Sequence, residues 1–213
     1  MHPILTPLRV EPGADLPESL PADSAVLLLP GAHRGALFVE AALQVDGAGA
    51  TLDAHGRGAT VHAAGDEGLL RIVGLRLRGG RSELGACLRV DGDMGVEAEG
   101  CVIEAGLAGQ GGDAVGALRG RLRLVGCQVL GELMLTGVAE AELVNCVVEG
   151  DLKLREGASL RLVGGAVRGT LDLRGTTTRA PTCTVEGTAL AALRNDPRLP
   201  GLVMGVSATV PGA

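Results

Sequence analysis

Leu122-Arg-Leu-Val-Gly126 and Leu160-Arg-Leu-Val-Gly164 are two copies of a short alternating segment that decides the fold of this chain. Each copy puts two apolar side chains on one face of a strand and ends in a residue that tolerates a left-handed backbone. Asn fits the same place because it is among the few other residues that tolerate positive φ. This end position, the bend column, recurs at Gly47, Gly74, Gly100, Gly126, Asn145, Gly164 and Gly187. The intervals of 27, 26, 26, 19, 19 and 23 residues form a period that is typical of a solenoid.

Apolar residues recur at fixed distances from the bend column. Two and four residues before it they are predicted to face inward, as Val45/Leu43, Ile72/Leu70, Ala98/Val96, Leu124/Leu122, Leu143/Ala141, Leu162/Leu160 and Val185/Cys183. Three residues after it lies a second inward set, namely Ala50, Leu77, Ile103, Val129, Val148, Val167 and Leu190. A third strand precedes the pair on several coils, as in Cys87-Leu-Arg-Val90, Leu133-Met-Leu135, Leu152-Lys-Leu154 and Leu171-Asp-Leu173. Three short strands per turn predict a triangular coil.

These motifs resemble the right-handed parallel β-helix of the pectin-lyase-like superfamily over residues 25–190. The start, Val26-Leu-Leu-Leu-Pro-Gly31, followed by a strand that ends at Gly47, is similar to the first coil of that superfamily. We therefore predict an all-β solenoid of about seven coils. Residues 1–24 are expected to form an N-terminal capping segment and residues 191–213 a C-terminal cap or tail. A short helix is expected over 189–194, where the solenoid ends. The resemblance implies little about function, because the superfamily contains lyases, hydrolases, esterases, phage spikes and non-enzymes.

The composition excludes several classes of function. The net charge is −6 and the chain has one Phe and no Trp or Tyr, so a basic, aromatic nucleic-acid surface is not expected. No stretch of 18 apolar residues predicts a membrane span. The N-terminus lacks a basic start followed by an apolar run, which favours the cytoplasm. The spacing of the four histidines predicts no metal site, and no phosphate-binding loop is complete, so we expect no cofactor.

Three of the five cysteines directly follow the bend column. Cys101, Cys127 and Cys146 should therefore stack on successive coils. A metal ladder and a disulfide are two interpretations of this stack. A buried column of small apolar side chains is the third, and we favour it because free Cys is among the most buried residue types and Leu75 and Gly165 occupy the same position on neighbouring coils.

Arg and Glu alternate three residues before the bend, where side chains should face outward. The row reads Gln44, Arg71, Glu97, Arg123, Glu142, Arg161 and Thr184. Opposite charges on neighbouring strands attract by roughly 0.2–1 kcal/mol per pair. We interpret the row as a solvated, stabilising ladder, and the alternative is a recognition surface for a charged partner or for another copy of the chain.

Enzymes of the superfamily usually act in a groove beside the third strand, and the resemblance implies where a site would lie here. The outward residues of that strand are predicted to be His62, Arg89, Met134, Lys153 and Asp172. Arg89, Asp91, Asp93 and Asp113 are the candidate catalytic residues, since paired acids carry glycoside hydrolysis and acids with Arg carry calcium-assisted elimination. The signature motifs of the pectin-degrading enzymes and sugar-stacking Trp or Tyr are missing. The alternative for Val90-Asp-Gly-Asp93 is a polar turn.

Residues 148–173 repeat Val-x-Gly-[Asp/Thr]-Leu-x-Leu in coils of 19 residues. This rhythm resembles bactofilins, the bacterial cytoskeletal β-helices that polymerise without nucleotide. We therefore expect a non-catalytic structural or interaction β-helix that self-associates or belongs to an assembly. A polysaccharide-active lyase or glycoside hydrolase is the alternative function.

Overall fold

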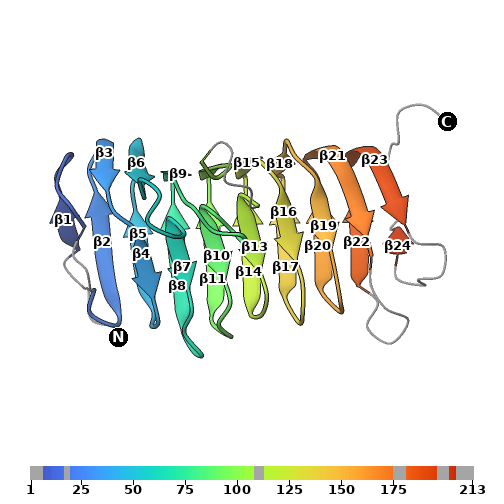
Figure 1. Cartoon of the computed structure of the whole chain (residues 1–213), viewed down its shortest axis with the longest axis horizontal. Helices are drawn as coiled ribbons and strands as arrows, with labels where there is room; N and C mark the ends of the chain where they lie inside the picture. The colour runs from blue at the N-terminus through green and yellow to red at the C-terminus, as the bar shows by residue number, and fades with distance from the viewer. Residues whose placement is uncertain (1–6, 17–19, 108–112, 175–180, 196–201, 205–213) are drawn as a thin grey trace.

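The chain is a straight rod of stacked β-strands in the computed structural model, which describes residues 7–16, 20–107, 113–174, 181–195 and 202–204 (Figure 1). Over these residues the strands form one sheet of ten and one of fourteen, and every pairing is parallel. The predicted all-β solenoid of about seven turns is confirmed. The described ranges contain no helix of the length and apolarity needed to cross a bilayer.

Three faces make up each turn. The first face is the ten-stranded sheet: β1 (Leu8–Val10), β2 (Ser24–Leu28), β5 (Leu43–Asp46), β8 (Leu69–Val73), β11 (Gly95–Glu99), β14 (Arg121–Val125), β17 (Glu140–Val144), β20 (Ser159–Val163), β22 (Thr182–Glu186) and β24 (Leu202–Met204). The second face contains β3 (Gly31–Arg34), β6 (Ala50–Asp53), β9 (Arg76–Arg78), β12 (Val102–Glu104), β15 (Gln128–Leu130) and β18 (Val147–Val148). The third face contains β4 (Leu37–Val39), β7 (Val61–Ala63), β10 (Leu88–Val90), β13 (Val115–Ala117), β16 (Leu133–Leu135) and β19 (Leu152–Leu154). The longer β21 (Ala166–Leu173) pairs with both β18 and β19, so it continues from the second face into the third, and β23 (Ala189–Asn195) follows it.

The bend column turns the chain from the first face to the second. Asn145 has φ of 52°, and five of the six bend glycines, from Gly74 to Gly187, have φ between 59° and 66°. From Gly47 to Gly164, the N–H of each bend residue still donates to a carbonyl of the next coil, as from Gly126 to Val144 O at 2.9 Å. The ladder therefore continues through the bend, and only the backbone conformation selects Gly or Asn there.

Gly47 is the exception in this column. It lies outside the positive-φ set, and Gly49 takes the left-handed conformation instead (φ 80°). A Cβ at Gly47 would lie 2.3 Å from Leu75 Cδ2, so close packing selects this glycine. The turn is two residues longer here, and Leu52 rather than Ala50 is in register with Leu77.

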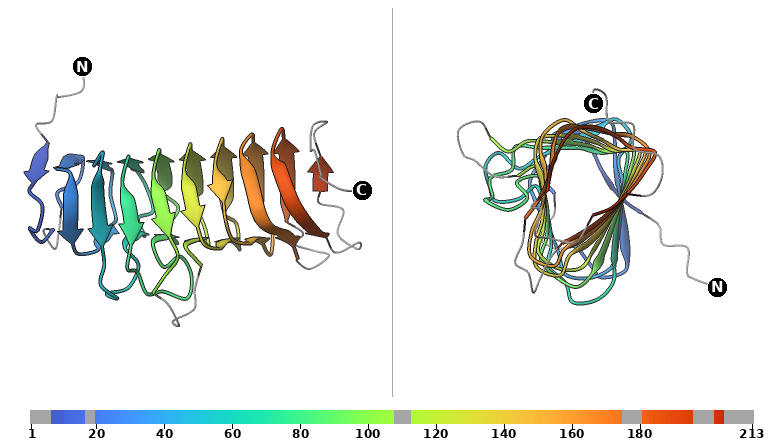
Figure 2. Two further views of the ribbon diagram at one scale, coloured as in Figure 1. Left: turned by 90° about the horizontal axis from the view of Figure 1, so that it is seen from above. Right: turned by 90° about the vertical axis from the view of Figure 1, so that its right-hand side faces the viewer.

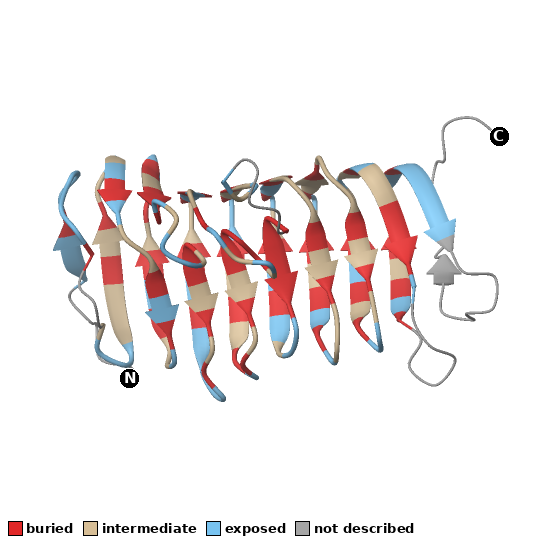
Figure 3. Cartoon of the chain, viewed as in Figure 1, coloured by how far each residue is buried: buried red, intermediate tan, exposed pale blue. Residues whose placement is uncertain are grey.

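The core is a set of like residues stacked coil on coil (Figure 3). The inward columns predicted for the first face are buried along the rod, including Val45, Ile72 and Leu124 at 0% exposure. This alternation of buried and exposed residues confirms the predicted inward sets, apart from the shift at Ala50.

Strand pairing extends past residues 25–190 at both ends. At the N-terminus β1 pairs with β2, and Val10 and Leu16 are buried against the first coil. At the C-terminus the predicted helix over 189–194 is wrong, because these residues form strand β23 on β21. Leu190 is opposite Val167 in this pairing, and the parallel ladder overrides the helix propensity of the Ala- and Leu-rich segment. Pro197, Pro200 and Pro211 lie outside the described residues.

Coil length changes along the rod as the intervals predict. The coils up to β13 have longer connections on the side of the second and third faces, at 54–60, 79–87 and 105–114. Figure 2 shows the connections at 54–60 and 79–87 projecting from one side of the rod. The later coils turn from β15 to β16 and from β18 to β19 with only a few residues.

Candidate functional site

The outward residues of the third face stand in one row. His62, Arg89, Gly116, Met134, Lys153 and Asp172 are in register across β7, β10, β13, β16, β19 and β21. This confirms the predicted outward set. The loop 79–87 crosses the row at β13, because a Cβ at Gly116 would lie 2.7 Å from Leu84 Cδ1.

Arg89 and Asp91 meet at the N-terminal side of this crossing. Arg89 Nε donates to Asp91 Oδ2 at 2.8 Å, and His62 Nε2 contacts Asp91 Oδ1. Burial opposes ionisation of Asp91, but the hydrogen bonds from His62 and Arg89 outweigh it and hold the pKa of this carboxyl below its usual value. The ring of Phe38, 57% exposed, packs edge-on against His62 with centroids 5.0 Å apart.

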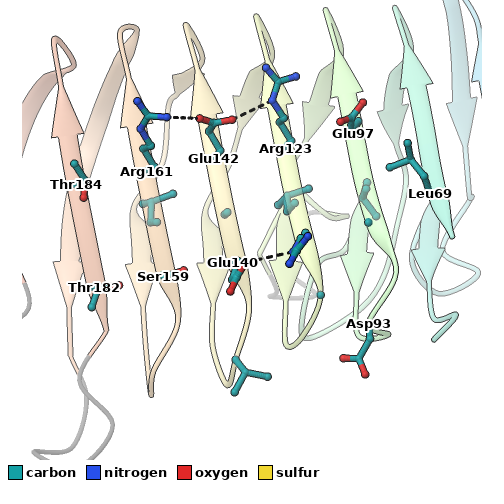
Figure 4. Close-up of a pocket in the computed structure, with 18 of the residues that line it drawn as sticks. Leu69, Asp93, Glu97, Arg123, Glu140, Glu142, Ser159, Arg161, Thr182 and Thr184 are labelled. Carbon is teal, nitrogen blue, oxygen red and sulfur yellow. Dashed lines mark hydrogen bonds and ion pairs between the residues drawn. The ribbon is translucent and has the colours of Figure 1, made fainter. Parts of the chain in front are cut away.

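The other two candidate acids lie elsewhere. Asp93 is exposed in the turn before β11, at the edge of the first face (Figure 4). The Asp113 carbonyl accepts from the Ala86 N–H, which places Asp113 five residues before Asp91 along the strand direction of the third face. That offset is about 16 Å in extended chain, well beyond the separation that a carboxylate pair needs for glycoside hydrolysis. The structure therefore brings together only Arg89 and Asp91 of the four predicted residues.

Asp113 has two neighbours that sequence reasoning did not assign to a site. Lys153 Nζ lies 3.9 Å from Asp113 Oδ1 and also contacts Glu132 Oε2. Burial raises the pKa of Asp113, 3% exposed, to about 6; the Lys153 charge opposes this rise and Glu132 reinforces it. The sequence signal for Glu132 is an acid directly before the third strand, which recurs at Asp151 on the next coil.

A second buried carboxylate ends the row. Asp172, 3% exposed, accepts from Arg174 Nη2 at 2.6 Å and from Arg155 Nη2 at 2.9 Å. The hydrogen bond from Arg174 and the one from Arg155 together outweigh burial, so the pKa of Asp172 is held below its usual value. The geometry is that of a carboxylate fixed between two guanidinium groups, which joins two neighbouring coils rather than presenting a free acid.

The cysteine column is buried and its thiols are free. Cys101, Cys127 and Cys146 each donate to a carbonyl of the coil before, at 3.7, 3.3 and 3.3 Å, on Ile72, Ala98 and Leu124. Thr188 takes the same position after Gly187 and donates to Gly164 O at 2.9 Å. The neighbouring Cys127 thiol and burial raise the pKa of Cys101 and of Cys146. Core packing, the favoured interpretation, fits this geometry, and within the described ranges no three His, Cys, Asp or Glu side chains are grouped to hold a metal.

A small polar hollow of about 460 Å³ lies at the corner after β6, β9 and β12. Asp53 binds Arg78 Nε at 2.8 Å and the backbone N–H of His55 at 2.9 Å. The second bond holds His55 at φ of 50°. Gly79 is needed beside it, because a Cβ there would lie 2.0 Å from Asp53 Oδ1.

A second, larger hollow of about 910 Å³ lies on the first face and contains the predicted Arg/Glu ladder from Glu97 to Thr184 (Figure 4). The row from Gln44 to Thr184 is in register on seven successive strands, as predicted. Glu142 joins Arg123 Nε and Arg161 Nη1, each at 3.0 Å, and Arg161 also reaches Glu186 at 3.2 Å. Arg71 pairs diagonally with Glu99 at 3.5 Å, and within the described residues Glu97 makes no ion pair.

Comparison of the chain with protein-family models, with curated proteins and with solved structures found no match.

Proposed function

We propose that this chain is a non-catalytic structural or interaction β-helix that associates with further copies of itself. The observation that carries the proposal is the long, open hollow on the first face. Its lining comes from six strands, β8 to β22, which at strand spacing extend over about 24 Å. Leu69 and Val138 line it with 42% and 66% of their surface exposed. A long open face with exposed aliphatic side chains suits contact with a macromolecule better than enclosure of a small molecule.

The carboxylates of the third face support the same proposal. Asp91 is held by His62 and Arg89, and Asp172 by Arg155 and Arg174. The contacts of Asp91 with His62 and of Asp172 with Arg155 cross from one coil to the neighbouring one, so they strengthen the rod. A carboxylate whose oxygens already accept such hydrogen bonds, and whose pKa is lowered by them, is a poor nucleophile and a poor base.

The test is the mass of the protein in solution, by sedimentation velocity over a hundredfold range of concentration, with electron microscopy of the same sample. We expect species larger than one chain whose share grows with concentration. A strict monomer at every concentration would overturn the proposal.

Membership of the pectin-lyase-like superfamily, and the likeness of the C-terminal coils to bactofilins, are part of this proposal. The 19-residue coils of β14 to β20 support the second likeness. We further propose a bacterial, cytoplasmic setting, and the five free, buried thiols are compatible with a reducing compartment.

A polysaccharide-active enzyme is the second candidate, and one observation favours it. Asp113, Glu132 and Lys153 form a cluster in which one carboxyl has a pKa near 6, a value suited to general acid catalysis. The test is release of reducing ends, or of unsaturated products, from a panel of acidic and neutral polysaccharides. Activity that Glu132→Gln abolishes and Glu83→Gln leaves unchanged would favour the enzyme; no activity on the panel favours the structural role.

A further inference from the structure

The outer surface of the first face has three rows of outward side chains. The middle row is the Arg/Glu ladder. The second row is Leu69, Gly95, Arg121, Glu140, Ser159 and Thr182, and the third is Val73, Glu99, Val125, Val144, Val163 and Glu186. With four Arg and five Glu, these rows are close to neutral, whereas the whole chain carries −6. A second copy can therefore approach this face with little repulsion.

The middle and second rows have opposite charges on either side of the line midway between β14 and β17. Two copies can meet face to face if a twofold axis runs parallel to the strands, above this line. Such an axis places the two rods antiparallel. A twofold axis perpendicular to the face would leave both faces pointing the same way. Strand β14 then lies over β17 of the second copy, and β11 over its β20. Arg123 would face Glu142 of the second copy, Arg121 would face Glu140, and Val125 would face Val144.

In this arrangement Glu97 gains an ion-pair partner. It would face Arg161 of the second copy, whereas within its own chain it makes no ion pair among the described residues. Gly95 would face Ser159, so the small residues of the hollow leave room for the long side chains of the other copy. The middle and second rows are therefore complementary to themselves in charge, and in the third row Val125 faces Val144 while Glu99 faces Val163.

The neighbouring registers do not match. An axis between β11 and β14 also pairs opposite charges in the middle row, Glu97 with Arg123 and Arg71 with Glu142, but in the second row it sets Leu69 against Glu140 and Gly95 against Arg121. An axis between β17 and β20 sets Arg123 against Thr184 and Arg121 against Thr182. Of these three lines, only the β14/β17 line pairs opposite charges in both charged rows.

Apolar contacts mark the same line. Leu118 and Val138 lie in the turns that lead into β14 and β17, and they are 39% and 66% exposed. They are adjacent, because the Val138 N–H donates to Leu118 O at 3.2 Å. About the same axis Leu118 faces Val138 of the second copy, and their burial supplies the favourable free energy that exposed ion pairs lack.

From this self-complementary pattern we infer that the first face is the contact surface for a second copy of this chain, in a twofold, antiparallel dimer centred between β14 and β17. The inference rests on the proposed self-association and names its surface. The face measures about 24 Å by 17 Å, about half the area per partner of a standard specific interface, so the dimer is weak and transient and its population depends on concentration and salt.

Charge reversal with rescue tests the register. Arg161→Glu should weaken dimerisation about tenfold or more, because the introduced carboxylate would meet Glu97 of the second copy. Adding Glu97→Arg should restore it to within about threefold of wild type. Residues 97 and 161 lie three strands apart, about 14 Å, so rescue cannot come from contact within one chain. The dissociation constant is measured by sedimentation equilibrium, beside the melting temperature of each variant.

Val138→Asp tests the apolar contact, and Arg168→Glu is the matched control. Arg168 is 64% exposed and pairs with Glu149 on the second face, away from the proposed contact. Val138→Asp should abolish dimers, and Arg168→Glu should leave the dissociation constant unchanged. Self-association that neither Arg161→Glu nor Val138→Asp weakens would overturn this surface while the proposed function stands. Absence of any self-association by the wild type would overturn both.

Discussion

Lys153 Nζ lies 3.9 Å from the buried carboxylate of Asp113, two coils away along the rod. The ammonium also contacts Glu132, so two acids share one cation. Burial and the second acid together keep the pKa of Asp113 above its ordinary value in spite of Lys153.

The first prediction concerns the pH dependence that Asp113 gives to stability. Its pKa is about 6 in the folded chain and near 3.9 in the unfolded chain, so the protonated form favours folding. This stabilisation is complete below about pH 4 and is lost as pH rises through 6, by up to about 3 kcal/mol. Asp113→Asn should remove this part of the dependence and be more stable than wild type at pH 8. Urea unfolding from pH 4 to 8 measures the free energy of unfolding of wild type and variant, with Glu83→Gln as an exposed control. A free energy for Asp113→Asn that changes with pH in parallel with wild type would contradict the assignment.

The second prediction concerns Asp172, whose pKa is lowered in the folded chain. Its contribution to stability is present above about pH 4 and is lost as the carboxylate is protonated. Asp172→Asn should destabilise by about 2–4 kcal/mol, because Arg155, only 23% exposed, is left without its charge partner. Arg174→Ala should destabilise much less than Asp172→Asn, since this side chain is 56% exposed and its charge is screened by solvent. Chemical denaturation at pH 7 measures both, and equal losses for the two variants would show that burial does not decide the effect.

The third prediction separates backbone strain from crowding at the bend column. Gly126 has φ of 59°, and a Cβ there meets no atom within 4 Å. Gly126→Ala should therefore cost about 1–2 kcal/mol from the left-handed backbone alone, and Gly126→Asn should cost less. Gly165→Ala should cost more than either, because its Cβ would lie 2.0 Å from Cys146 O. Thermal and denaturant unfolding of the three variants give the order, and a Gly126→Asn variant less stable than Gly126→Ala would contradict it.

The fourth prediction concerns the thiols. All five cysteines are buried, and burial raises the pKa of Cys183 to about 12. A soluble disulfide reagent at pH 8 should therefore react slowly with the native protein and quickly with all five thiols in denaturant. Cys127→Ser should keep most of the stability, since the hydroxyl of Thr188 already fills this column and bonds to Gly164 O. Rapid reaction of two or more native thiols would show that the column is open to solvent.

The fold was predictable because each coil repeats one local rule. Val45, Ile72 and Leu124 face inward by simple alternation, and Asn145 could be placed among the glycines from its tolerance of positive φ. The predictions that failed or shifted were at the ends of the repeat. Residues 189–194 have a composition that favours a helix, yet the free edge of β21 pairs with them as a strand. Because the first turn is longer, Leu52 instead of Ala50 is in register with Leu77.

The sequence by itself determined the bend column, the inward columns and the outward Arg/Glu row, since backbone conformation and side-chain alternation are properties of each residue and its near neighbours. Only the tertiary structure decided which charges meet. His62 contacts Asp91, which lies 29 residues further along the chain. Lys153 lies beside Asp113, which is two coils before it. Such partners depend on loop length and on the stacking of whole coils. The local pattern therefore specified a ladder of Arg and Glu, and only the stacked rod showed that Glu97 is left without an ion pair among the described residues.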